Sequence, residues 1–226
     1  MNISALSGTE RARFNMIEQQ IRPWDVLDER VLQALFNVQR ERYVPAPMQG
    51  LAFSDVELPL IINAIDTRES MLTPKVEARL AQELQLKSTD CVLEIGTGSG
   101  YQAALLANLA QQVTTVEIDH RLAAFAQENL KRNQAGDVKV EVGDAHAGWG
   151  TTEYDAILVT GSVPVVPDAL KYQLRVGGRL VVVVGQHPIM TACRVTRTSA
   201  ASFETHSLFD TVIKPLRGVC VSQFKF

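Results

Sequence analysis

The stretch VLEIGTGSG, residues 92–100, constrains the fold of this chain more than any other feature. It begins with apolar residues typical of a buried strand, and glycines follow at alternate positions, Gly96, Gly98 and Gly100. An alanine- and leucine-rich stretch typical of a helix comes next, YQAALLANLA. A strand, a glycine turn and a helix form the first half of a nucleotide-binding βαβ unit, because glycine lets a ligand approach the backbone. The sequence therefore predicts a ligand site at this turn.

The spacing of the glycines differs from the dinucleotide fingerprint. That fingerprint, G-x-G-x-x-G, would place the third glycine at Tyr101, but here it comes one residue earlier. Glu94 precedes the turn, and its carboxylate would repel a pyrophosphate and attract an ammonium or a sulfonium. The motif E-x-G-x-G-x-G resembles the first motif of the S-adenosylmethionine-dependent methyltransferases. An NAD-dependent oxidoreductase, or a cofactor-binding module without catalysis, is the alternative from another class, and both observations speak against NAD.

Strands and helices are predicted to alternate after residue 90. The predicted strands cover residues 91–95, 113–118, 138–142, 154–160 and 179–184, and the predicted helices cover 101–110, 121–133 and 167–174. This alternation predicts an α/β fold with a doubly wound, mostly parallel, Rossmann-like sheet. Residues 191–199 and 206–216 read as two strands with no helix between them, so we expect an antiparallel edge.

The first part of the chain is predicted to be a helical appendage. One helix covers residues 9–21, with Thr9 as its cap and Pro23 as its breaker, and a second covers 27–38. Residues 43–73 are expected to form a long irregular loop, and such loops are usually functional. We therefore divide the chain into an appendage with a substrate loop, 1–73, and a cofactor-binding core, 74–226, forming one compact unit. The helices are either a packing cap or a lid over the cofactor.

Composition indicates which partners and which cellular compartment to expect. The chain has 226 residues and a formal net charge of −3, which gives no support for non-specific nucleic-acid binding. The excess of basic residues after Gln186 is expected to be solvated surface. Three cysteines without metal-ligand spacing, Cys91, Cys193 and Cys220, indicate reduced thiols in a cytoplasmic protein without a metal site. The longest aliphatic run, 180–184, is too short to span a bilayer, so we expect no membrane partner.

Polar residues follow the predicted strands at the edge where such sheets bind ligands. Glu117 ends the second strand and is expected to accept hydrogen bonds from two ribose hydroxyls. Asp144 is expected to accept from an adenine amine, while the amide of Ala145 points at a ring nitrogen. Thr160 ends the fourth strand, which should face the methyl group. The predicted cofactor-binding residues are Glu94, Gly96, Thr97, Gly98, Gly100, Tyr101, Glu117, Ile118, Asp144, Ala145 and Thr160.

Several stretches together resemble one family, the protein-L-isoaspartate O-methyltransferases. They are RERYVPAP, AFSDVELPL, VLEIGTGSGYQAALLA, VEID, VGDAHAGW, YDAILVTGSVPVVPDAL, VGGRLVVVVG and FDTVIKPLRG, in the expected order over about residues 40–218. The resemblance implies a cytosolic repair enzyme that takes S-adenosylmethionine as methyl donor. It implies a protein or peptide substrate that carries isoaspartate, whose carboxylate is methylated. A different acceptor, such as a small acid or another protein side chain, is the alternative within the family.

The segment that would bind the substrate departs from the family. Its motif resembles G-Q-T-I-S-Q-P, with hydroxyl residues that hold the substrate carboxylate, whereas this chain has TRESMLTP. When the two motifs are aligned on Pro74, the family's serine falls on Leu72 and its threonine on Ser70. A shifted register is the alternative, because the segment from Pro59 to Pro74 is longer here than in the family. Ser70 and Thr73 are the candidate substrate-binding hydroxyls, and we favour Ser70 because Thr73 is expected to cap the next helix.

Two further expectations concern the chemistry at this segment. Glu69 would repel an acidic substrate unless Arg68 pairs with it. A carboxylate nucleophile has a pKa of about 4 and needs no general base at neutral pH, so no catalytic residue is assigned.

Overall fold

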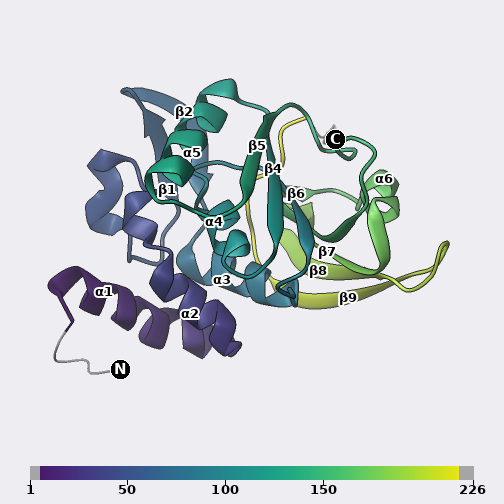
Figure 1. Cartoon of the computed structure of the whole chain (residues 1–226), viewed down its shortest axis with the longest axis horizontal. Helices are drawn as coiled ribbons and strands as arrows, with labels where there is room; N and C mark the ends of the chain where they lie inside the picture. The colour runs from purple at the N-terminus through teal and green to yellow at the C-terminus, as the bar shows by residue number, and fades with distance from the viewer. Residues whose placement is uncertain (1–5, 219–226) are drawn as a thin grey trace.

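The protein is built around one seven-stranded sheet. The computed structural model describes residues 6–218, and its strand order is β5-β4-β3-β6-β7-β8-β9 (Figure 1). The strands are β3 (Cys91–Ile95), β4 (Gln112–Glu117), β5 (Val138–Val142), β6 (Tyr154–Val163), β7 (Leu174–Gln186), β8 (Ile189–Arg197) and β9 (Phe203–Asp210). The first five run parallel to their neighbours, and β8 and β9 are antiparallel. The predicted fold class, with its antiparallel edge, is confirmed.

The sheet has the three helices that the alternation predicted, α4 (Tyr101–Ala107), α5 (His120–Arg132) and α6 (Asp168–Tyr172). The helix expected after Thr73 is α3 (Pro74–Glu83). The central strands are buried on both faces, and the residues from Leu180 to Val183 are each 0% exposed. The parallel strands β3 and β6 lie side by side although α4, β4, α5 and β5 separate them in sequence. Strands β4 and β5 are added on one side of β3, and β6 and β7 on the other, so the strand order has its switch point between β3 and β6. Ligands bind at such a switch point, outside the carboxyl ends of the strands.

The N-terminal helices begin differently from the prediction. Helix α1 (Gly8–Met16) is capped by Ser7, not by Thr9. Ser7 Oγ accepts from the Glu10 amide at 3.3 Å, and Glu10 Oε2 accepts from the Ser7 amide at 2.8 Å. This reciprocal box needs an acid three residues after the cap, and Thr9 has Ala12 there. The helix continues through a π-turn (Ile17–Ile21) and a 3₁₀ turn (Arg22–Trp24), which tolerates Pro23 in its first turn.

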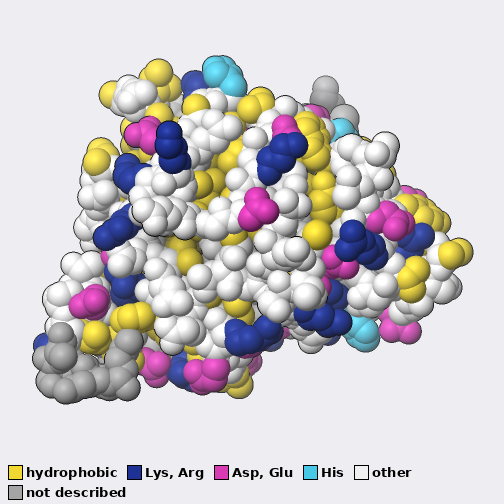
Figure 2. All heavy atoms as spheres, viewed as in Figure 1, with side chains coloured by type: hydrophobic (Ala, Val, Ile, Leu, Met, Phe, Trp, Pro, Cys, Tyr) yellow, Lys and Arg dark blue, Asp and Glu magenta, His cyan; other side chains and the backbone are white. Residues whose placement is uncertain are grey.

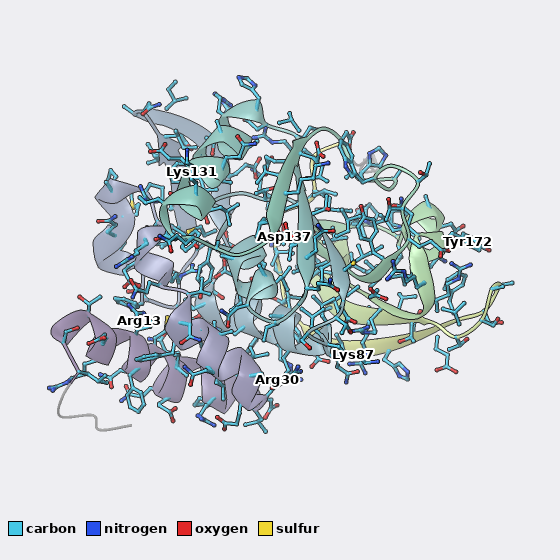
Figure 3. The ribbon with its side chains drawn as sticks, in the orientation of Figure 1. Arg13, Arg30, Lys87, Lys131, Asp137 and Tyr172 are labelled. Atoms are coloured by element: carbon cyan, nitrogen blue, oxygen red, sulfur yellow. The ribbon has the colours of Figure 1, made fainter. Side chains whose placement is uncertain are left out.

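One arginine joins the N-terminal helices to each other and a second joins them to the core, and both are labelled in Figure 3. Arg13 of α1 donates to the carbonyl of Phe36 at 3.2 Å and forms an ion pair with Glu41. Arg30 of α2 (Glu29–Asn37) donates to the carbonyl of Leu86 at 2.9 Å. Buried residues of α1, α2, α3, α4 and the sheet belong to one continuous hydrophobic cluster. The appendage is therefore packed onto the α3 side of the core rather than loosely tethered.

Residues 43–73 are not the irregular loop that we predicted. After the 3₁₀ turn η4 (Arg40–Arg42), they contain a second 3₁₀ turn, η5 (Ala46–Leu51), and then a hairpin of β1 (Leu58–Ile62) and β2 (Ile65–Met71). Asn63 and Ala64 form its two-residue turn with φ of 51° and 62°, the conformation that matches the twist of paired strands. Only alternate residues are buried, and charged residues on the outer face hide the strand pattern. Local sequence therefore gave a weak signal for this hairpin.

The C-terminal segment also differs from the prediction. Strand β9 ends at Asp210, whereas the predicted strand continued to residue 216. Residues 211–216 instead return to the end of β6, where Ser162 and Pro215 form a parallel bridge. The Ser162 amide donates to the Lys214 carbonyl, and the Leu216 amide to the Ser162 carbonyl, both at 2.9 Å. In Figure 1 this yellow segment runs upward from β9, towards the side of the view where the β1–β2 hairpin lies.

The surface and the remaining sequence features are unexceptional. Basic and acidic side chains are interspersed over the face shown in Figure 2. Cys91 and Cys193 are free thiols, and Cys220 lies outside the described residues. Within residues 6–218, no helix has the length and apolarity that crossing a membrane requires.

Candidate active site

One cavity lies at the carboxyl ends of β3, β4, β5 and β6. The hairpin β1–β2 and the C-terminal segment form its other walls. Its lining residues come from six segments of the chain: Glu57, Leu60, Glu69, Ser70, Leu72, Ile95, Gly96, Gly98, Val116, Glu117, Ile118, Leu122, Gly143, Asp144, Ala145, His146, Thr160, Gly161, Lys214, Pro215, Leu216 and Arg217. Among the described residues, the lining begins at Glu57, so α1 and α2 take no part in it. Their placement favours a packing cap over a lid.

The glycine turn forms the floor of this cavity. Gly96 and Gly98 have φ of 99° and 54°, in the left-handed region that disfavours other residues. Thr160 holds the turn against β6, because its Oγ1 donates towards the Gly96 carbonyl at 2.7 Å and the Ile95 carbonyl at 3.0 Å. A Cβ on Gly98 would meet only Leu60 Cδ1, at 3.5 Å. The space above Gly98 is therefore open to a ligand.

Glu117 is fixed beside the turn by two backbone donors. Gly98 N–H donates to Oε2 at 2.9 Å and Asp119 N–H to Oε1 at 3.1 Å. Each oxygen keeps a second lone pair, so the carboxylate can accept two further hydrogen bonds from a pair of neighbouring hydroxyls. Burial raises the pKa of Glu117, although the two amides oppose that rise. A ligand that supplies two hydroxyl donors would satisfy this buried acceptor.

Asp144 follows β5 on the same side of the cavity. Its Oδ1 accepts from the His146 amide at 3.1 Å and lies 2.8 Å from His146 Nδ1. Partial desolvation works against ionisation, but the hydrogen bonds from His146 prevail and lower the pKa of Asp144. Ala145 is buried beside it, and Ile118 offers an apolar surface that is 41% exposed. An ionised acceptor next to apolar surface suits a flat base with an exocyclic amine.

Four predicted cofactor residues do not line the cavity: Glu94, Thr97, Gly100 and Tyr101. Thr97 contacts Thr115 through their hydroxyls at 2.7 Å, and Gly100, with φ of 82°, starts α4 where that helix packs on α5. Tyr101 is buried under the Arg40 guanidinium, 5.0 Å from its ring centre. These residues support the turn from below.

Glu94 differs most from its expected setting. We predicted a carboxylate that faces the ligand, but Glu94 is fully buried, with 0% of its surface exposed. Thr115 Oγ1 donates to its Oε2 at 2.5 Å. Burial raises the pKa of Glu94 to about 8, with Thr115 opposing and the charge of Glu117 adding to the rise. The reason is that β3 is a central strand covered on both faces of the sheet. Glu94 is paired in register with Thr115 and Leu158, so its side chain projects with theirs into the layer that covers one face and is removed from water.

Comparisons with known proteins identify the family of this chain. The sequence profile of the protein-L-isoaspartate(D-aspartate) O-methyltransferases matches residues 11–218. The chain belongs to this family. A protein-L-isoaspartate O-methyltransferase of Rhodopseudomonas palustris is 42% identical over 205 residues, which cover 90% of this chain and 92% of the relative. Protein-L-isoaspartate O-methyltransferase 2 of Marinobacter nauticus is 39% identical, covering 94% of each chain.

A solved structure shares the fold of this family member. It is a Plasmodium falciparum protein described as a protein-L-isoaspartate O-methyltransferase, in complex with S-adenosyl-L-homocysteine. The TM-score is 0.76 at 19% identity, covering 94% of this chain and 99% of that one. At this identity the likeness concerns the fold.

The backbone at Arg68 bears on the register of the substrate segment. Aligned on Pro74, the first glycine of G-Q-T-I-S-Q-P falls on Arg68, whose φ is 63°. Glycine is the residue that adopts this conformation without strain, so the unshifted register explains it. Ser70 is exposed and lines the cavity, whereas Thr73 does not.

The prediction for the Thr73 side chain is wrong in one respect. Thr73 is at the N-cap position of α3, but its side chain forms no capping hydrogen bond. Its Oγ1 is buried, with no hydrogen-bond partner among residues 6–218. The amides of Val76 and Glu77 donate instead to the Thr73 carbonyl, both at 3.1 Å.

Sequence reasoning missed the C-terminal wall. Glu69 is paired with Lys214 (Nζ–Oε2, 2.8 Å) and with Arg217 (Nε–Oε1, 2.5 Å), not with Arg68. Arg217 also donates to the Thr67 carbonyl at 2.8 Å. The available signal was the basic excess after Gln186, which we assigned to solvated surface. Two of those cations line the cavity instead.

Proposed function

We propose that this protein is an S-adenosylmethionine-dependent carboxyl methyltransferase that methylates isoaspartyl residues in proteins or peptides. The match of the family over residues 11–218 carries the proposal. The cavity supports it, because three features meet at the switch point: the glycine turn, the Glu117 carboxylate with lone pairs for two more hydrogen bonds, and the Asp144 carboxylate as an acceptor for an adenine amine. The proposed role of the protein is repair in the cytoplasm, which agrees with the free thiols of Cys91 and Cys193.

The residues fit the methyl donor in a definite order across the cavity. Glu117 would hold the ribose hydroxyls, and Asp144 with the Ala145 amide would hold the adenine edge. Ile118 would cover one face of the base, and Gly96 and Gly98 would admit the aminoacyl part of the donor. Glu94, Thr97, Gly100 and Tyr101 would act through the turn that they support. The donor, when bound, supplies an electrophilic methyl group on a sulfonium.

The protein's own part in the reaction is alignment. A substrate carboxylate is already ionised at neutral pH, so no proton has to be removed before it attacks the methyl carbon. The carboxylate oxygen must be held in line with the methyl group, about 3 Å from it. Ser70 projects into the cavity from β2 and is the proposed hydroxyl donor to the other carboxylate oxygen. The neutralised Glu69 beside it no longer repels the substrate.

The test is methyl transfer to a matched peptide pair. One peptide contains a single isoaspartyl residue and the other the normal aspartyl residue at the same place. We expect incorporation of labelled methyl into the isoaspartyl peptide only. Methylation of both peptides, or of neither while a small acid is methylated, would favour the alternative acceptor.

Ser70→Ala tests the assigned hydroxyl in the same assay. We expect its KM for the isoaspartyl peptide to rise roughly tenfold to a hundredfold, the effect of one lost hydrogen bond to a charged group. Wild-type kinetics for Ser70→Ala would remove Ser70 from the proposal.

A further inference from the structure

Lys214 lies where the active-site cavity meets a second cavity. It lines both, together with Glu57 and Pro215. The second cavity is mainly apolar and is formed by residues 162–164, 185–190 and 212–215. A peptide could occupy the second cavity while its carboxylate reaches into the adjoining active-site cavity. Lys214 is therefore at the junction between the space for a peptide and the space for the methyl donor.

The backbone of Lys214 is fixed relative to the glycine turn. The two hydrogen bonds with Ser162 hold residues 214–216 as an extra strand beside β6. Leu216 is on the same face of this strand as Lys214, roughly 7 Å away, since side chains two apart in a strand share a face. Leu216 Cδ1 lies 3.9 Å from the position of a Cβ on Gly96. The lysine stem can span the remaining distance towards the turn.

Lys214 can leave Glu69 without leaving that carboxylate unpaired. Glu69 holds Lys214 on Oε2 and Arg217 on Oε1, so Arg217 still neutralises it after Lys214 has moved. Arg217 is the anchored partner, because it also contacts the Thr67 carbonyl and Asp119. Lys214 makes its other contact with the Arg68 carbonyl, and its side chain is 48% exposed. Of the two cations, Lys214 is the one free to change partners.

The cavity needs such a cation. Glu57 and Glu69 both line its mouth, and their charges would repel an anionic substrate. Lys214 lines the same cavity as both carboxylates and is paired with Glu69. Desolvation raises the pKa of Glu57, and the charge of Lys214 acts against that rise. Leu72, at the position of the family's serine, has no donor to offer. We propose that Lys214 binds the isoaspartyl carboxylate and so replaces the missing hydroxyl as a specificity determinant.

This inference rests on the proposed function, and the experiment separates the two. Three peptides of one sequence carry isoaspartate, aspartate or isoasparagine, whose carboxamide has no charge. Their affinities are measured by calorimetry on enzyme saturated with S-adenosylhomocysteine, for wild type, Lys214→Met, Lys214→Arg and Lys139→Met. Lys139 is the control, because it is an exposed lysine of β5 paired with Glu141, away from both cavities.

We expect wild type and Lys139→Met to bind the isoaspartyl peptide more tightly than the isoasparaginyl one. Lys214→Met should weaken isoaspartyl binding roughly tenfold to a hundredfold, the range for one hydrogen bond to a charged group, and bring the two affinities together. Lys214→Arg should recover part of the difference, and affinity for S-adenosylhomocysteine should stay unchanged in all variants.

The outcomes against the inference are equally definite. If Lys214→Met keeps the preference for the isoaspartyl over the isoasparaginyl peptide, Lys214 does not bind the carboxylate, and the proposed function stands. If wild type does not distinguish isoaspartyl from aspartyl peptide, the proposed function fails and this inference fails with it.

Discussion

Glu94 should make the protein less stable as the pH rises. Its carboxyl group is buried in β3, and within the described part of the chain Oε1 has no hydrogen-bond partner. Burial raises its pKa from 4.5 to about 8. The folded state therefore binds a proton that the unfolded state has already released between these two pH values. Stability is highest below pH 4.5 for this group, falls through the interval, and is fully reduced above about pH 8.

The magnitude follows from the separation of the two pKa values. At 1.36 kcal/mol per pKa unit, the shift corresponds to roughly 5 kcal/mol as an upper limit. Structural relaxation around a newly charged group reduces that figure, so we expect about 2–4 kcal/mol. Glu94→Gln has nearly the same shape, and its amide oxygen can still accept from Thr115. The variant cannot ionise, so its free energy of unfolding should lack this fall.

The assay is urea unfolding of wild type and Glu94→Gln at pH 5, 7 and 9, in the absence of cofactor. We expect Glu94→Gln to gain stability relative to wild type by about 2–4 kcal/mol between pH 5 and pH 9. Glu128→Gln, on the exposed face of α5, is the control and should follow wild type at every pH. Parallel pH profiles for wild type and Glu94→Gln would refute the reasoning, because the buried carboxyl would then ionise without cost.

Three further predictions concern the cofactor and the core. Glu117→Ala should weaken S-adenosylmethionine binding by about 1.5–3 kcal/mol in calorimetry, because it removes an acceptor for the ribose; unchanged affinity in the folded variant would exclude that role. Gly98→Val should lose cofactor binding while its circular dichroism stays close to wild type, since φ of 54° and a branched Cβ disturb only the turn; normal binding would make the turn purely structural. Arg40→Met should lower the free energy of unfolding by about 3–5 kcal/mol, because it leaves Glu77 buried without its ion-pair partner; Arg40→Met with Glu77→Leu should recover much of that loss, and no recovery would contradict the assignment.

Part of the cofactor site could be predicted from local sequence. The strand, glycine turn and helix at residues 91–107 are consecutive, so hydrophobic pattern and glycine spacing are enough to predict them. Glu117 and Asp144 were found because parallel strands bring their carboxyl ends to one edge of the sheet. The sequence could not reveal that Glu94 is buried beside Thr115, since its burial depends on where β3 is inserted in the sheet.

The substrate side was decided by contacts between distant residues. Charges on the outer face concealed the hairpin β1–β2, which exists because its two strands pair with one another. Glu69 is neutralised by Lys214 and Arg217, which lie about 150 residues further along the chain and reach it only because residues 211–216 return to β6. Local sequence determines which backbone conformations each segment favours, whereas ion pairing and burial depend on which segments the completed sheet brings together. For this protein, local sequence was enough to predict the glycine turn proposed to bind the cofactor. Only the contacts between distant segments bring two cations beside the proposed site of the substrate carboxylate.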